Sequence, residues 1–297
     1  MSLYGEIAAL SAALCWAINS YLYSLAGRQV GSLAVTHVRL WIAIALLAVT
    51  HLLVYHTLIP DGLSQSGFLY LSVSGLIGYV FGDIMLFEAL VLIGPQLAML
   101  MMTLAPIFSA LIGWGVLHET LSSLEILAIG LTLTGIGWVV TEKRDHTHEQ
   151  KRQYGLGIIM GGLGAVGQSV GLLFSRLGMQ DGVSPLSANL IRVSVSALFM
   201  LLIMALRGKA IPQFVAMKNR TACRQIVIGS FFGPYLGVML ALYSINHATL
   251  GVASTLMQLV PIFLIPITYF LMKERISLRT LMGTLIAIGG AAMFFGI

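Results

Sequence analysis

The sequence predicts an all-α membrane protein with ten transmembrane helices, built as two inverted five-helix repeats. Three observations support this: too little charge for a soluble protein, a sequence that repeats internally, and basic residues gathered in alternate loops. Of the 297 residues, 58% are hydrophobic and 9% are charged, whereas a soluble domain typically has about 25% charged residues. Such a chain cannot cover a surface that faces water, so its helices must face lipid.

The apolar segments are long enough to cross a bilayer. A run of about 18 or more apolar residues is typical of a membrane-spanning helix. The first segment has no early Lys or Arg and carries Glu6, which favours a retained span over a cleaved signal peptide. The ten expected helices cover 3–25, 34–56, 67–91, 95–117, 123–141, 155–176, 185–206, 224–245, 250–272 and 277–296.

Local signals mark several joints between these helices. Pro95 suits the first turn of a helix, where its missing N–H is not needed. Ser122-Ser-Leu-Glu125 forms a capping-box pattern at the start of the fifth helix. The most polar stretch is TEKRDHTHEQKRQ at 141–153. We therefore expect a first repeat at 1–141, a cytoplasmic linker at 142–154 and a second repeat at 155–297.

The internal repeat is clearest where LAPIFSALIGWGVLHETLS at 104–122 returns as LVPIFLIPITYFLMKERIS at 259–277. Pro106 matches Pro261, an offset of 261 − 106 = 155 residues. Earlier in each half the offset slips by about two residues, so that Arg39 matches Arg192. Further pairs at the offset of 155 are Gly78/Gly233, Gly82/Gly237, Met102/Met257, Glu119/Glu274, Ser122/Ser277 and Gly135/Gly290.

Five helices per repeat is an odd number, so the second copy must start from the opposite side of the membrane. Short cytoplasmic loops are enriched in Lys and Arg. The even-numbered loops hold only Arg176, whereas the odd-numbered loops hold thirteen basic residues. These are Arg28, Lys143, Arg144, Lys151, Arg152, Arg207, Lys209, Lys218, Arg220, Arg224, Lys273, Arg275 and Arg279. We expect the odd loops in the cytoplasm and both termini outside.

The chain resembles the drug/metabolite transporter superfamily, EamA type. The resemblance rests on the repeated Pro-x-Phe, the acidic loop residue after it, the GYVFGD segment at 78–83 and the five-plus-five arrangement. It implies a transporter in a bacterial inner membrane that exports amino acids, other small metabolites or toxic compounds. Inverted repeats themselves are typical of secondary transporters, whose site lies between the repeats.

Asp83 is the foremost candidate site residue because it lies well inside the third predicted helix. A carboxylate inside the membrane is costly and usually faces a cavity or a partner. Asp83 could bind a cationic group, carry a coupling proton, or form a salt bridge that only holds helices together. Uncharged polar residues are expected to line the same substrate site: Asn19, Tyr79, Thr103, Gln168, Tyr235 and Gln258.

Five further residues are weaker candidates. Glu88 lies nearer its helix end. Trp16 is expected either in the wall of a cavity or at the membrane interface. His37 can titrate near neutral pH and is a candidate for proton coupling. For Arg39 and Arg192 we expect side chains that extend to the membrane interface, with binding of a substrate carboxylate as the alternative.

The predicted function is a secondary transporter that exports small amphipathic metabolites, such as amino acids, by alternating access. The alternative is an intramembrane enzyme or scaffold whose duplication is structural, and a selective channel is a third hypothesis. We find no P-loop, metal motif or catalytic triad, and expect no cofactor and no metal. The expected partners are a small-molecule substrate and the lipid bilayer, not nucleic acid. A monomer suffices for the pathway, and a dimer remains open.

Overall fold

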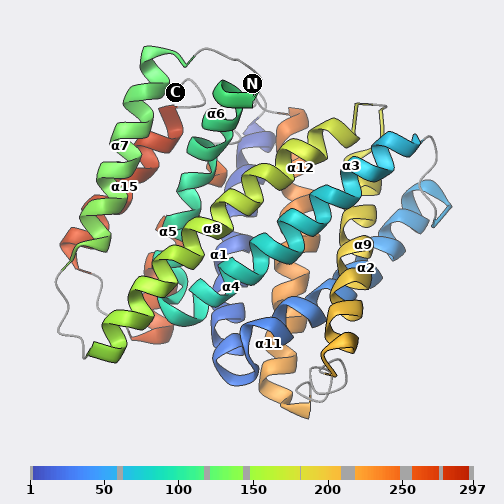
Figure 1. Ribbon diagram of the computed structural model, residues 1–297, viewed down its shortest axis with the longest axis horizontal. Helices are drawn as coiled ribbons and strands as arrows, with labels where there is room; N and C mark the ends of the chain where they lie inside the picture. The colour runs from blue at the N-terminus through green and yellow to red at the C-terminus, as the bar shows by residue number, and fades with distance from the viewer. Residues whose placement is uncertain are drawn as a thin grey trace.

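The protein is helical throughout the part that the computed structural model describes, namely residues 3–58, 63–116, 121–142, 148–180, 182–208, 218–247, 256–273 and 277–293. Within these ranges there is no β-strand. Figure 1 shows a bundle in which α1 lies near the centre, while α7 and α15 lie side by side at one edge. The predicted all-α class is therefore confirmed for the described residues.

The first half contains seven α-helical pieces and two irregular turns. The pieces are α1 (Leu3–Val30), α2 (Ser32–Tyr55), α3 (Gln65–Gly75), the π-helical segment η1 (Leu76–Gly82), α4 (Asp83–Leu92), α5 (Gly94–Met101), the 3₁₀ turn η2 (Met102–Leu104), α6 (Ala105–Val116) and α7 (Ser123–Val140). The capping box expected at Ser122 is present: the Ser122 hydroxyl accepts from the Glu125 N–H, and the Glu125 carboxylate accepts from the Ser122 N–H.

The second half repeats this order as far as the helix that follows its first π-helical segment. Its described pieces are α8 (His148–Gly178), α9 (Pro185–Leu206), α11 (Arg220–Ser230), the π-helical segment η4 (Phe231–Gly237), α12 (Val238–His247), α14 (Val260–Ile267), the π-helical segment η5 (Thr268–Met272) and α15 (Leu278–Met293). The first part of the expected helix at 250–272, and the matched pair Glu119 and Glu274, lie outside the described residues.

Within the described ranges, eight helices are long and apolar enough to cross a membrane, and two shorter apolar helices follow at Val260–Met272 and Leu278–Met293. The largest change from the expected boundaries is at α8, which begins at His148 rather than at 155. The Tyr154 hydroxyl donates to the Val140 carbonyl at 3.1 Å, which ties the start of α8 to the end of α7. The many polar residues at 142–154 predict a linker, but from His148 onward the chain is helical, and the contact of Tyr154 with α7 supports this helix.

The internal repeat extends to the irregular parts of the backbone. The π-helical segments η1 and η4 begin at Leu76 and Phe231 and end at Gly82 and Gly237. Both ends differ by the same offset, since 231 − 76 = 155 and 237 − 82 = 155. π-Helical turns are rare and are frequently found at functional sites. Their occurrence at matched positions shows that the two halves share a structure as well as a sequence pattern.

The packing of α7 against α15 is reciprocal under the same offset. A Cβ atom added to Gly135 would lie 2.6 Å from the Gly283 carbonyl oxygen, and one added to Gly290 would lie 3.0 Å from the Ala128 carbonyl oxygen. Gly290 is the counterpart of Gly135, and Gly283 is the counterpart of Ala128. Each helix therefore presents the same surface to its counterpart, as in a contact with a two-fold axis.

Glycines also form the contact between the two halves at η1 and α8. A Cβ atom on Gly167 would lie 2.7 Å from the Gly82 Cα atom, and one on Gly171 would lie 3.0 Å from the Gly78 Cα atom. Small residues four apart allow helices in lipid to approach this closely. This close packing brings Gln168 of α8 directly against η1.

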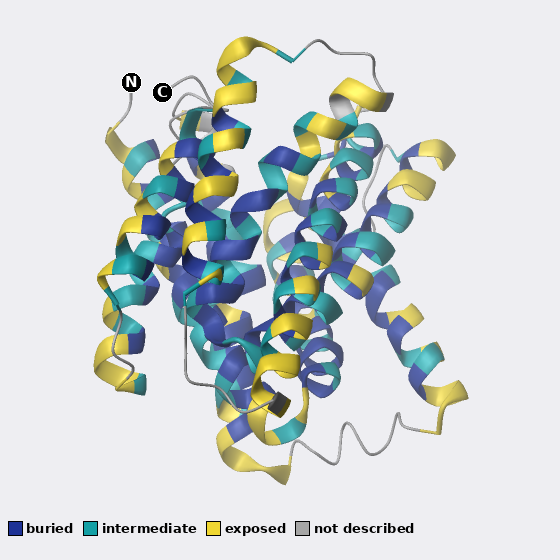
Figure 2. Ribbon diagram, turned by 60° about the vertical axis from the view of Figure 1, so that its left-hand side comes forward, coloured by how far each residue is buried: buried dark blue, intermediate teal, exposed yellow. Residues whose placement is uncertain are grey.

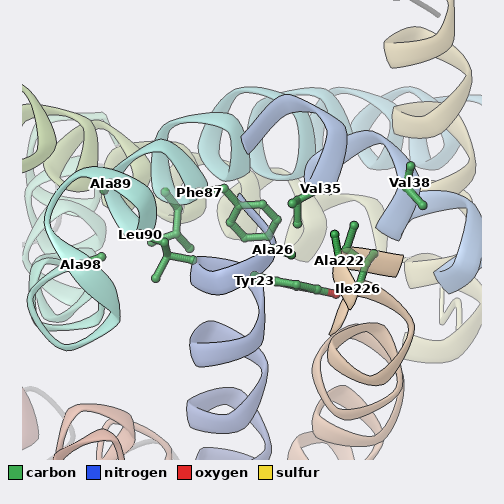
Figure 3. Close-up of a cluster of buried hydrophobic side chains, with 11 residues drawn as sticks. Tyr23, Ala26, Val35, Val38, Phe87, Ala89, Leu90, Ala98, Ala222 and Ile226 are labelled. Atoms are coloured by element: carbon green, nitrogen blue, oxygen red, sulfur yellow. The ribbon is translucent and has the colours of Figure 1, made fainter. Parts of the chain in front are cut away.

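Buried residues concentrate along the inward helix faces, and exposed apolar residues cover the outside (Figure 2). One core cluster joins α1, α2, α4, α5 and α11. In Figure 3, Tyr23 of α1 extends toward Ala222 and Ile226 of α11, with Phe87 of α4 nearby. The rings of Tyr23 and Phe87 lie 5.1 Å apart between centroids. Through Phe87, this cluster also contacts Arg39, one of the charged residues described next.

Candidate functional site

Asp83 lies at the junction of η1 and α4 and is 4% exposed. Its Oδ2 atom forms an ion pair with Arg39 Nη2 of α2. Its Oδ1 atom accepts a hydrogen bond of 2.8 Å from Gln168 Nε2 of α8. Asp83 therefore joins α2 and α4 of the first repeat to α8 of the second. Asp83 thus has the salt-bridge partner that was one of the arrangements expected for it.

Arg39 is buried as deeply as its partner, at 5% exposed. Its guanidinium carbon lies 4.8 Å from the centroid of the Phe87 ring and 5.6 Å from that of Tyr79. Aromatic faces attract a cation and partly replace the water that burial removes. The expectation that Arg39 extends to the membrane interface is wrong, because a carboxylate and two rings hold its charged group inside the bundle.

Tyr79 connects this ion pair to the second repeat. Its hydroxyl donates a hydrogen bond of 2.5 Å to Asn189 Oδ1 of α9. The guanidinium carbon of Arg192, also on α9, lies 4.7 Å from the centroid of the Tyr79 ring. Arg39 and Arg192 are counterparts in the repeat, and both lie against Tyr79. The resulting cluster comprises Arg39, Tyr79, Asp83, Gln168, Asn189 and Arg192, and we call it the two-arginine cluster.

Three other expected site residues lie at η4, the segment of the second repeat that corresponds to η1. A Cβ atom on Gly237 would lie 2.7 Å from Trp16 Nε1, and Asn19 lies against Gly233. Tyr235 accepts a hydrogen bond of 3.2 Å from Thr50 of α2. Trp16 and Asn19 of α1 thus lie against η4, as Gln168 of α8 lies against η1, but no ion pair is present among these described residues.

Four expected residues do not join the two-arginine cluster. Thr103 donates to the Leu100 carbonyl of its own helix at 2.7 Å. Glu88 accepts from the Ser32 hydroxyl at the start of α2. His37 is fully buried on α2, and Gln258 lies in the turn before α14.

Asn189 was missed from sequence because an uncharged amide in an apolar helix is unremarkable alone. The available signal was its position three residues before Arg192, which places both side chains on one face of a helix.

The cluster has the composition of a polar recognition site rather than of a metal centre. No group of three or more His, Cys, Asp or Glu side chains suited to a metal ion occurs among the described residues. The chemistry available is charge pairing, hydrogen bonding and cation–π contact, all at a contact between the two halves. Secondary transporters built from two repeats place their substrate site at the contact between the repeats, and this cluster lies at such a contact.

The chain belongs to the EamA-like transporter family, whose sequence pattern matches residues 3–141 and again residues 155–296. It is accordingly a multi-pass membrane protein of a transporter family, with a two-repeat architecture. No protein of curated function matches the chain. A solved structure titled "Crystal structure of protein" is similar, with a TM-score of 0.64 and 17% identity over 99% of this chain and 96% of the other. At that identity the likeness shows the fold alone.

The hydrogen bond from Tyr79 to Asn189 gives a first prediction. Tyr79→Phe keeps the ring against both arginines and removes only the hydroxyl. We expect a loss of about 1 kcal/mol, the usual net contribution of one buried hydrogen bond, measured as a lower Tm of the purified protein. Tyr70→Phe is the matched control, since Tyr70 is 37% exposed. Equal Tm values for the two variants would contradict this assignment.

Proposed function

We propose that the protein is a secondary transporter that exports small amphipathic metabolites, such as amino acids, by alternating access. The observation that carries this proposal is the two-arginine cluster, to which both repeats contribute. Asp83, Arg39 and Tyr79 belong to the first half, and Gln168, Asn189 and Arg192 to the second. If the halves move relative to each other, these contacts must break and re-form, which couples the site to the motion.

We also propose ten spans in two inverted repeats, at 1–141 and 155–297, joined by a cytoplasmic linker at 142–154. Contacts between α7 and α15 support the inversion. Arg279, at the start of α15, donates to Thr141, at the end of α7, at 2.8 Å, and Thr280 donates to Glu142 at 3.0 Å. The last helices of the two repeats thus run antiparallel. The distribution of Lys and Arg favours both termini outside a bacterial inner membrane.

A pair of cysteine substitutions tests the inversion. Ser123 and Leu278 are counterparts at the starts of α7 and α15, and both are exposed. In a protein with Cys15→Ala and Cys223→Ala, a membrane-impermeant maleimide added to intact cells should label Ser123→Cys but not Leu278→Cys. Both should react after permeabilisation. Labelling of both from the same side would contradict inverted repeats.

Flux into proteoliposomes tests the transport function. Pooled amino acids and common metabolites are supplied with and without a pH gradient, to the wild-type protein and to Asp83→Asn. Saturable flux in the wild-type protein that is lost in the folded variant would support a transporter in which Asp83 takes part. Saturable flux that survives would assign Asp83 a structural role. Non-saturable flux without competition between solutes would favour a channel.

The alternative of an intramembrane enzyme or scaffold predicts different results. An enzyme would convert a solute that stays on one side of the vesicle membrane, and substitutions in its site would abolish that conversion. A scaffold would tolerate loss of Asp83 as long as the bundle folds. Members of the EamA-like transporter family are transporters, and the site composition adds no catalytic arrangement among the described residues, so transport is the better supported function.

A further inference from the structure

Unpartnered hydrogen-bond donors are gathered in the two-arginine cluster. Among the described residues, Arg192 Nε and Asn189 Nδ2 are buried without a hydrogen-bond acceptor. Both side chains contact Tyr79, through its ring or its hydroxyl. A buried donor without a partner costs about 1–3 kcal/mol, so two at one place indicate a site suited to an acceptor group.

The charges of the cluster indicate which acceptor. It contains two guanidinium groups and one carboxylate, Asp83, which is already engaged by Arg39 and Gln168. Arg192 forms no ion pair within the described residues and is only half-buried. The cluster therefore has one positive charge in excess, attached to a planar donor group that matches a carboxylate in shape.

The position of these donors on α9 supports a single binding point. Asn189 and Arg192 are three residues apart on one helix, so their side chains are neighbours on the same face. Tyr79 fixes both: its hydroxyl holds Asn189 Oδ1 at 2.5 Å, which leaves Nδ2 as the free donor, and its ring supports the guanidinium. A Cβ atom on Gly78 would lie 3.4 Å from Arg192 Nη2, so the guanidinium lies directly beside η1.

We propose that Arg192 and Asn189, positioned by Tyr79, bind the carboxylate of a small metabolite beside the Arg39–Asp83 ion pair. The inference rests on the proposed transport function and specifies its substrate class. Asp83 neutralises Arg39, so that Arg192 is the arginine left for substrate. A substrate with a single carboxylate fits this one unpaired cation better than a phosphate dianion, which would need a second free cation.

A binding measurement tests this inference separately from transport. The Tm of the purified full-length protein is recorded against amino acids and C2–C6 carboxylates, each paired with its amide, and against phosphorylated sugars. The variants are Arg192→Gln, Arg192→Lys and Asn189→Asp. The last of these replaces the free donor Asn189 Nδ2 by a negatively charged oxygen. The matched control is Arg176→Gln, since Arg176 is exposed at the end of α8.

The wild-type protein and Arg176→Gln should be stabilised by at least one carboxylate and far less by its amide. Arg192→Gln and Asn189→Asp should raise the half-saturating carboxylate concentration roughly 10- to 100-fold, the effect of one charge-assisted contact, and Arg192→Lys should lose less. Three results for the wild-type protein would overturn the inference: equal binding of a carboxylate and its amide, a preference for phosphate, or no carboxylate binding. An unchanged preference in Arg192→Gln and Asn189→Asp would overturn it as well. Carboxylate binding without saturable flux in proteoliposomes would instead sustain the site and overturn the transport function.

Discussion

Asp83→Asn is expected to destabilise the folded bundle strongly, because it leaves Arg39 charged and buried without its carboxylate. Removing one partner of a buried ion pair costs about 3–5 kcal/mol, which should lower the Tm of the purified protein by several degrees or more. Arg39→Gln should cost a similar amount, since Asp83 is then the uncompensated charge. The exposed carboxylate Glu149 supplies the control, and Glu149→Gln should leave the Tm unchanged.

The double variant Arg39→Gln/Asp83→Asn separates the ion pair's structural role from its functional one. With both charges removed, two amides can hydrogen-bond in place of the ion pair, and much of the lost stability should return. Transport should not return with it if Asp83 couples or binds. Independent, additive losses in the double variant would show that Arg39 and Asp83 do not interact as the geometry requires.

Gly167→Ala carries the second large effect. A Cβ atom at this position would meet the backbone of Gly82 at 2.7 Å, and a backbone atom cannot move aside as a flexible side chain can. Overpacking of this kind typically costs about 1–3 kcal/mol. The added methyl group should also push α8 away from η1 and lengthen the hydrogen bond between Gln168 and Asp83.

Gly162→Ala is the matched control on the same helix. Its added Cβ atom would approach only the flexible end of Met101, at 4.0 Å, and alanine favours a helix over glycine by about 1 kcal/mol. We expect Gly162→Ala to be neutral or stabilising and Gly167→Ala to lower both the Tm and the flux. If the two variants behave alike, the close contact between α8 and η1 does not hold the site together.

Much of the architecture can be predicted from the sequence alone. The length and apolar content of the segments predict the helices, and the constant offset of 155 residues predicts the two repeats. The importance of Asp83 is also predictable, because a carboxylate deep in an apolar helix needs a partner wherever it lies.

The identity of that partner is not predictable from the chain. Arg39 lies 83 − 39 = 44 residues before Asp83, and only the packing of α2 against α4 brings them together. The same limit explains the wrong expectation for Arg39, since a sequence does not show which face of α2 is lined by Phe87 and Tyr79. The π-helical segments were likewise missed, because the Gly-x-x-x-Gly spacing at Gly78 and Gly82 predicts close packing but not the wider turn that accompanies it.

Counterflow tests the central claim most directly, namely that the two repeats form an alternating-access carrier. Proteoliposomes loaded with a high concentration of an unlabelled solute that shows saturable flux are diluted into a trace of the labelled solute. A carrier that exposes one site to each side in turn should accumulate the label transiently above its equilibrium level. That overshoot should be absent in Arg39→Gln/Asp83→Asn. Label that only equilibrates, or that does not enter, would contradict the account.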